Sequence, residues 1–214
     1  MQRVIMVILA LLILADGVYY VHLLESEGFS RIHPLKKGAP YRIYDTEQCP
    51  RDEVTSFIAT EEEIILYYDD CGLINVYGLD GEFQYGIQVE CIKNGRGNIG
   101  YLKGLLYIRA RSHKIYIFDG TSLIESYSSQ DKEEDYRWVN KFVEREKQNI
   151  IKGTEYYYQN ELNQIISKTR SGIEEVVVAL PQKNKGVYTT GMLFLILIAV
   201  FAWIWDQRKS KVVK

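Results

Sequence analysis

Twenty consecutive residues without a charge, from Gly186 to Trp205, constrain this chain more than any other feature. At about 1.5 Å per residue, a helix of this length is about 30 Å long, which matches the hydrocarbon core of a bilayer. Tyr188 lies near one end and Trp203 and Trp205 near the other, where aromatic rings favour the membrane interface. Core helices are seldom apolar on every face over this length. The segment is therefore predicted to be a transmembrane helix.

The charges on either side of this helix predict its orientation. Residues 206–214 carry four Lys and Arg side chains, whereas Lys183 and Lys185 are the basic residues just before the helix. Basic residues concentrate on the cytoplasmic side of a membrane. We therefore expect a cytoplasmic tail and an extracytoplasmic domain before the helix.

The N-terminus holds a second apolar stretch, which has two interpretations. The twelve residues from Val4 to Ala15 suit the hydrophobic region of a signal peptide, with cleavage after Ala15. Extended to Leu24, the stretch instead suits an uncleaved anchor, with Asp16 and His22 as costly exceptions. Under both interpretations, the middle of the chain is translocated across the membrane. The predicted division is a signal-anchor or signal peptide (1–24), an extracytoplasmic domain (25–185), a transmembrane helix (186–205) and a basic cytoplasmic tail (206–214).

The charge of the central domain excludes one class of partner. Residues 25–185 hold 26 acidic and 21 basic side chains, a net charge near -5. A nucleic-acid-binding surface requires an excess of Lys and Arg. We therefore expect no nucleic-acid partner.

Three stretches of this domain share one pattern, a β-branched and aromatic run, a polar or Gly-containing turn, and a second such run. This pattern is typical of a β-hairpin. The first two stretches align without a gap at an offset of 41 residues, which matches Ile74 to Ile115. The three stretches are residues 64–77, 105–118 and 155–168.

A further strand is predicted on each side of every hairpin. The strands expected before the hairpins are Glu53–Ala59, Asn98–Leu102 and Arg137–Val143, and another turn and strand follow each hairpin. Four short antiparallel strands in about 40 residues match the period of a β-propeller blade. Residues 131–148 fit either a strand or an amphipathic helix, and the pattern leaves both open.

The runs LYYDDCGLINVYGLDGEF (66–83) and LYIRARSHKIYIFDGTSL (106–123) resemble the NHL-type blade of β-propellers. In that blade a strand, a polar turn, an aromatic-bearing strand and an Asp-Gly turn follow in order, and Asp80-Gly81 and Asp119-Gly120 supply the last turn. The resemblance implies a mainly β fold of antiparallel meander, propeller-like repeats from about Glu53 to Leu180.

Three blades are fewer than the four to eight of a closed propeller. Tyr41–Asp45 is a candidate strand for a fourth, partial blade. Without a fourth blade, the array stays open or closes against a partner.

One motif mimics a dinucleotide-binding fingerprint. Gly95, Gly97 and Gly100 follow the G-x-G-x-x-G spacing, with Gly104 behind them and Asp119 at the end of a later strand. The fingerprint requires a helix after the glycines to hold a pyrophosphate. The residues after Gly100 instead fit a hairpin strand, so a glycine-rich loop between repeats is the preferred interpretation.

Charged clusters provide weaker candidates. Carboxylates in turns can bind calcium, but the spacing of Asp69, Asp70 and Asp80 fits no calcium loop. Glu61, Glu62 and Glu63 are predicted to form a solvated turn. The basic cluster is either a polar hairpin face or a site for an acidic group or lipid headgroup, and it comprises Arg109, Arg111, His113 and Lys114.

The three cysteines, Cys49, Cys71 and Cys91, have spacings that suit neither a metal chelate nor a disulfide framework. If the blade interpretation holds, Cys71 and Cys91 lie at the ends of the second and fourth strands of one blade. Those two strands are about 9.5 Å apart, which is too far for a disulfide, so none is expected between the two cysteines.

No catalytic motif is present, and the histidines (His22, His33, His113) are scattered. We therefore expect no enzyme activity, no cofactor and no metal. The sequence predicts a membrane-anchored extracytoplasmic interaction or sensory module, a candidate subunit of an envelope complex with a membrane or envelope protein partner. The alternative is a membrane-bound nucleotide- or small-ligand-binding protein that uses the Gly95–Gly100 loop.

Overall fold

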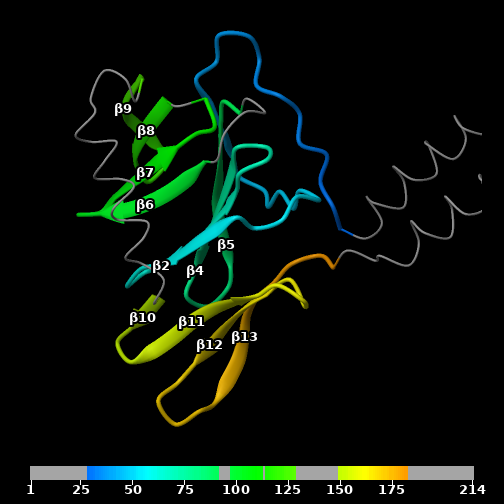
Figure 1. The fold of residues 1–214 in the computed structure, drawn as a ribbon, viewed down its shortest axis with the longest axis vertical. Helices are drawn as coiled ribbons and strands as arrows, with labels where there is room; N and C mark the ends of the chain where they lie inside the picture. Colours follow the sequence, from blue (N-terminus) through cyan, green and yellow to red (C-terminus); the bar gives the residue numbers. More distant parts are fainter. Residues whose placement is uncertain (1–27, 92–96, 113, 129–148, 183–214) are drawn as a thin grey trace, which may run out of the picture. The chain divides into compact units, whose positions relative to one another are not determined.

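A computed structural model describes residues 28–91, 97–112, 114–128 and 149–182 of the chain (Figure 1). All regular elements in these ranges are β-strands, which confirms the mainly β fold. The strands are β1 (Tyr41–Tyr44), β2 (Ser56–Ala59), β3 (Glu63–Tyr68), β4 (Leu73–Gly78), β5 (Phe83–Val89), β6 (Asn98–Leu102), β7 (Leu105–Arg109), β8 (Lys114–Asp119), β9 (Ser122–Ser128), β10 (Asn149–Ile151), β11 (Thr154–Gln159), β12 (Gln164–Lys168) and β13 (Glu174–Ala179).

The strands form three antiparallel sheets. The first sheet has the order β1-β5-β4-β3-β2, the second β6-β7-β8-β9 and the third β10-β11-β12-β13. Within each sheet, the strands from β2 onward therefore pair in the order in which they follow in the chain, as a meander requires. The three predicted hairpins are confirmed as β3–β4, β7–β8 and β11–β12.

The structure differs from the sequence predictions at three places. Tyr41–Tyr44 forms a strand as predicted, but this strand pairs with β5 at the edge of the first sheet and is not part of a fourth blade. The strand before the third hairpin is β10, and the predicted strand Arg137–Val143 lies outside the described residues, as does all of 131–148. The first difference concerns strand partners far apart in sequence, which local patterns do not specify.

The third difference is a shift of one residue in the second hairpin. Tyr67 pairs with Ile74 in the first hairpin, so an offset of 41 residues predicts that Ile108 pairs with Ile115. Ile108 pairs with Tyr116 instead. The connection between β7 and β8 is therefore one residue longer than its counterpart, and the gapless alignment is wrong across the turn. Side chains alternate between the two faces of a strand. Because of the shift, Ile115 points to the opposite face of its hairpin from the face that Ile74 occupies in the first hairpin.

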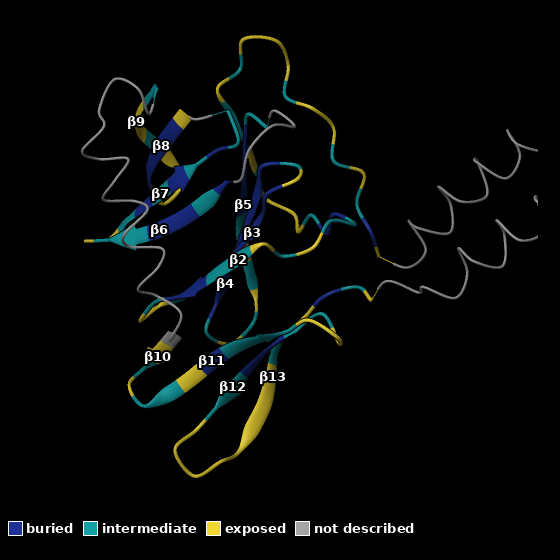
Figure 2. Ribbon diagram, viewed as in Figure 1, coloured by how far each residue is buried: buried dark blue, intermediate teal, exposed yellow. Residues whose placement is uncertain are grey.

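The first sheet is buried on both faces (Figure 2). Ile65 and Tyr67 of β3 pack in one core cluster with Ile108 and Phe118 of the second sheet. The alternate residues of β3 pack in a separate cluster with side chains of the third sheet: Ile64, Leu66 and Tyr68 with Tyr156, Ile165 and Val178. Strands buried on both faces read as continuous apolar runs, which explains the near-unbroken IILYY of β3.

Strand β2 lies where the three sheets meet. It contacts β6 of the second sheet and β10 of the third, each of which is the first strand of its meander. The outer strand β13 is largely exposed, and Val176 retains 53% of its accessible surface (Figure 2).

The two predicted membrane segments lie outside the described residues. Within the part of the chain that the structure describes, no helix has the length and apolar character that crossing a bilayer requires.

Candidate functional site

The glycine motif leads into a strand. β6 begins at Asn98 and includes Gly100, so the helix that a dinucleotide fingerprint requires is replaced by a β-strand, as the hairpin interpretation predicted. Gly95 lies outside the described residues. The backbone N–H of Gly97 donates a hydrogen bond of 2.8 Å to the Asp69 carboxylate. A donor that this motif would offer to a phosphate is therefore already bound by a carboxylate of the protein.

Gly97 is required by close packing rather than by a ligand. A Cβ at this position would collide with the hydroxyl of Tyr67 and lie 2.7 Å from Oδ1 of Asp69. Both neighbours are almost fully buried. The glycine therefore allows the start of the second sheet to approach the end of β3.

Asp69 is the centre of an ion-pair cluster between the first two sheets. Arg111 Nε lies 2.8 Å from Asp69 Oδ1, and Arg111 Nη2 lies 2.5 Å from Asp70 Oδ1. The Asp69 side chain is 2% exposed and that of Arg111 is 18% exposed. The hydrogen bond to Asp69 and the two carboxylates raise the pKa of Arg111, although partial burial opposes them. The guanidinium is therefore charged at all ordinary pH values.

This cluster changes the interpretation of the predicted charged groups. Asp69 and Asp70 pair with Arg111, while Asp80 accepts a hydrogen bond from the backbone N–H of Glu82 in a separate turn. Lys114 pairs with Glu90 at 2.8 Å. Arg109 ends β7, and His113 lies outside the described residues. In the described ranges, no three His, Cys, Asp or Glu side chains gather as metal ligands.

A groove of about 540 Å³ lies beside this cluster, and we call it the thiol groove. One wall is the N-terminal loop, and the other is formed by the end of β5 and the turn between β3 and β4. Its lining comprises Ile32, Pro34, Leu35, Lys36, Lys37, Gly38, Ala39, Asp70, Cys71, Gln88, Val89, Glu90 and Cys91.

Gln88 holds the N-terminal loop against β5. Its side-chain amide donates to the carbonyl of His33 at 3.0 Å and accepts a hydrogen bond from the Tyr44 hydroxyl at 2.9 Å. The Gln88 side chain is buried, so both of its polar atoms are satisfied inside the protein. His33 thus takes part through its backbone, and His22 lies outside the described residues.

Two thiols line the groove. Cys91 Sγ donates to the carbonyls of Asp69 and Asp70, at 3.3 and 3.2 Å, and Cys71 Sγ donates to the carbonyl of Tyr68 at 3.7 Å. Cys71, Cys91 and Cys49 are all free thiols. Burial is the main cause that raises the pKa of both groove thiols, so they are protonated at neutral pH.

A second hollow, of about 430 Å³, is lined by residues of β2, β6 and β10, one strand from each sheet. Glu61 and Glu62 lie on its rim as exposed carboxylates, in agreement with the predicted solvated turn. Glu63 begins β3 and is partly buried. The lining residues are Ile58, Ala59, Thr60, Glu61, Glu62, Tyr101, Gly104 and Ile151.

The two ends of the described domain meet. A Cβ on Gly28 would lie 3.4 Å from Cγ of Pro181. The Asn163 side chain donates to the Pro181 carbonyl at 2.6 Å, and the N–H of Ser30 donates to the Cys49 carbonyl at 2.7 Å. Both ends are therefore held to the body of the domain at one place.

Comparisons with known proteins identify no relative: no family model, curated protein or solved structure matches the chain. Lys36, Lys37 and Gln88 belong to no motif of the sequence that points to a site. Lys36 and Lys37 appear in the sequence as an adjacent pair in a Gly- and Pro-containing loop, which by itself is typical of a solvated turn.

Proposed function

We propose that this protein is a membrane-anchored extracytoplasmic interaction or sensory module and acts as a subunit of an envelope complex. The observation that carries the proposal is the contact between Gly28 and Pro181. Each of these residues lies a few positions from a predicted membrane segment.

The spacing supports two anchors that leave the domain side by side. Leu24, the end of the N-terminal apolar stretch, is four residues before Gly28, and Gly186 is five residues after Pro181. Extended chain spans at most about 3.6 Å per residue, so these connections reach no more than about 18 Å. Both predicted segments therefore begin close to one point of the domain, which suits insertion into a single bilayer. The tail charges favour a domain outside the cytoplasm.

A propeller-like array is the finer fold that we propose for this module. The resemblance to NHL-type blades and the contacts of β2 with β6 and β10 support it, because the first strand of each propeller blade lies nearest the axis. Three sheets are fewer than a closed ring needs, so a partner that covers exposed strands such as β13 agrees with the role of a subunit.

Protease sites on the two sides of the predicted membrane test this topology. One cleavage sequence is inserted after Ser171 in the turn between β12 and β13, where a Cβ on Gly172 would meet nothing within 4 Å, and another is placed after Lys211 in the tail. In spheroplasts that express the full chain, added protease is expected to cut only the first site. In inverted vesicles it is expected to cut only the second.

The reverse cleavage pattern would overturn the proposed location, and release of the full chain by alkaline carbonate would overturn the anchoring. The chain without inserted sites is the control for unspecific cleavage. Detergent-solubilised protein, in which both sites are expected to be cut, shows that each site is accessible.

A further inference from the structure

The thiol groove contains two cations that no described acidic group neutralises. Of its two acidic lining residues, Asp70 pairs with Arg111 and Glu90 pairs with Lys114. Lys36 and Lys37 are exposed and take part in none of the ion pairs within the described residues. Arg111 also pairs with Asp69, so one carboxylate charge remains at this turn, and the two lysines outweigh it. The groove therefore keeps a small excess of positive charge on a domain whose net charge is negative.

The remaining chemistry of the groove is neutral. The amide of Gln88 is already satisfied by Tyr44 and His33. The thiols of Cys71 and Cys91 donate to backbone carbonyls, and burial keeps them protonated, so they provide neither a nucleophile nor a thiolate ligand at neutral pH. What remains for a ligand is the pair of cations and an apolar surface.

That apolar surface comes from the N-terminal loop. Ile32 and Leu35 contribute it as partly buried side chains, whereas Val89 of β5 is 1% exposed and packs in the core of the domain. Gln88 ties the loop to β5, so the two walls are held together before any ligand arrives. A volume of about 540 Å³ lies within the roughly 300–1,000 Å³ typical of small-molecule sites.

We propose that the thiol groove binds a small organic anion, whose carboxylate or phosphate contacts Lys36 and Lys37 and whose apolar part packs against Ile32 and Leu35. This inference rests on the proposed sensory function for its biological meaning, and it names the ligand class of that function. A preformed groove requires little reordering on binding, which favours affinity.

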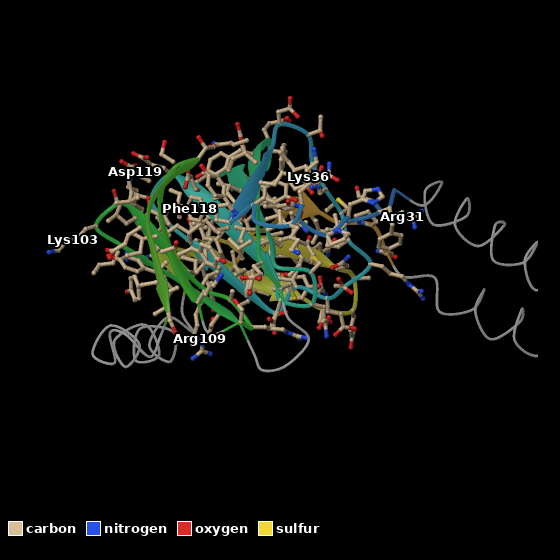
Figure 3. The ribbon with its side chains drawn as sticks, turned by 90° about the horizontal axis from the view of Figure 1, so that it is seen from above. Arg31, Lys36, Lys103, Arg109, Phe118 and Asp119 are labelled. Carbon is tan, nitrogen blue, oxygen red and sulfur yellow. The ribbon has the colours of Figure 1, made fainter. Side chains whose placement is uncertain are left out.

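Calorimetric titration of the full chain in phosphatidylcholine nanodiscs with phenyl phosphate tests the proposal. The double variant Lys36→Gln/Lys37→Gln is expected to bind at least tenfold more weakly. The matched control, Lys103→Gln/Lys152→Gln, removes the same charge from exposed residues at two other turns and is expected to stay within twofold. Figure 3 shows Lys103 extending away from the domain, far from Lys36 in that view.

Leu35→Ser separates the apolar contact from the charge. It is expected to weaken phenyl phosphate several-fold and to leave the weaker binding of inorganic phosphate unchanged. Unaltered circular dichroism spectra show that each variant is folded. Absence of saturable phenyl phosphate binding, or an equal loss in both double variants, would overturn the proposal.

The lipid composition of the nanodisc distinguishes a lipid headgroup from a soluble anion as the natural occupant of the groove. Loss of phenyl phosphate binding when phosphatidylglycerol replaces phosphatidylcholine identifies a lipid headgroup as the occupant, and unchanged binding identifies a soluble anion. The topology test in cells is independent of this titration, so failure of the groove and failure of the membrane location are distinguishable.

Discussion

The guanidinium of Arg111 lies 2.8 Å from the carboxylate of Asp69 and links the second sheet to the first. Arg111 belongs to the turn between β7 and β8, and Asp69 to the turn between β3 and β4. The two turns are equivalent in the repeated hairpins. Opposite charges at equivalent places of successive hairpins therefore join one sheet to the next.

Arg111→Ala is expected to destabilise the domain by about 3 kcal/mol, because removal of one partner leaves a buried carboxylate without its counter-charge. Lys114→Ala is the control, since its pair with Glu90 is exposed (50% and 41%) and exposed pairs contribute about 1 kcal/mol or less. Urea titration followed by circular dichroism measures both. Equal losses in the two variants would show that the Asp69–Arg111 pair is energetically ordinary.

Gly97→Ala is expected to cost about 1–3 kcal/mol of stability, because the added Cβ overlaps Tyr67 and Asp69, which are packed and buried. Gly100→Ala is a matched control in the adjacent strand. A Cβ there meets nothing within 4 Å, so this variant is expected to be neutral or slightly stabilising. Thermal unfolding compares the pair, and a neutral Gly97→Ala would contradict the close approach.

Glu63 makes stability depend on pH. Burial, followed by the nearby charge of Glu62, raises the pKa of Glu63 in the folded state. A carboxyl with a raised folded pKa contributes stability below its unfolded pKa and loses it as pH rises through the folded value. Glu63→Gln is therefore expected to raise the Tm at pH 7 and to leave it unchanged near pH 3.5. The exposed Glu82→Gln is expected to change neither, and a Tm gain that persists at acid pH would refute the assignment.

The thiols are expected to be unreactive in the folded protein. Burial, together with the charge and hydrogen bond of Glu47, raises the pKa of Cys49 to about 12. At pH 8 such a thiol is thiolate in only about one molecule in ten thousand. Iodoacetamide followed by mass spectrometry should therefore label Cys49 very slowly in native protein and rapidly in urea. Rapid native labelling at pH 8 would contradict the burial of this residue.

Local patterns predicted much of this fold. Ile64–Tyr77 and Leu105–Phe118 are predicted as hairpins because two β-branched and aromatic runs and the polar turn between them are short-range features. The strand after Gly97 was predicted for the same reason. The one-residue shift at Ile115 and the pairing of Tyr41 with Val89 were missed, because each depends on partners that periodicity does not specify.

The candidate site was largely beyond prediction. Arg111, Asp69 and Asp70 each drew attention as charged residues in turns, but only the packing of two sheets shows that Arg111 pairs with both carboxylates. Lys36 and Lys37 gave no signal, because a lysine pair in a loop is usually solvated. Their position beside Val89 follows from the hydrogen bond between Gln88 and His33, residues 55 positions apart.

The strand and turn pattern of the domain and the predicted membrane segments at both ends follow from local properties of the sequence, namely side-chain periodicity and uncharged length. Three relationships emerge only in the folded domain: the first sheet is buried on both faces, Arg111 reaches Asp69, and Gly28 lies against Pro181. These relationships arise from packing between residues distant in the chain, where burial and charge neutralisation depend on the whole fold.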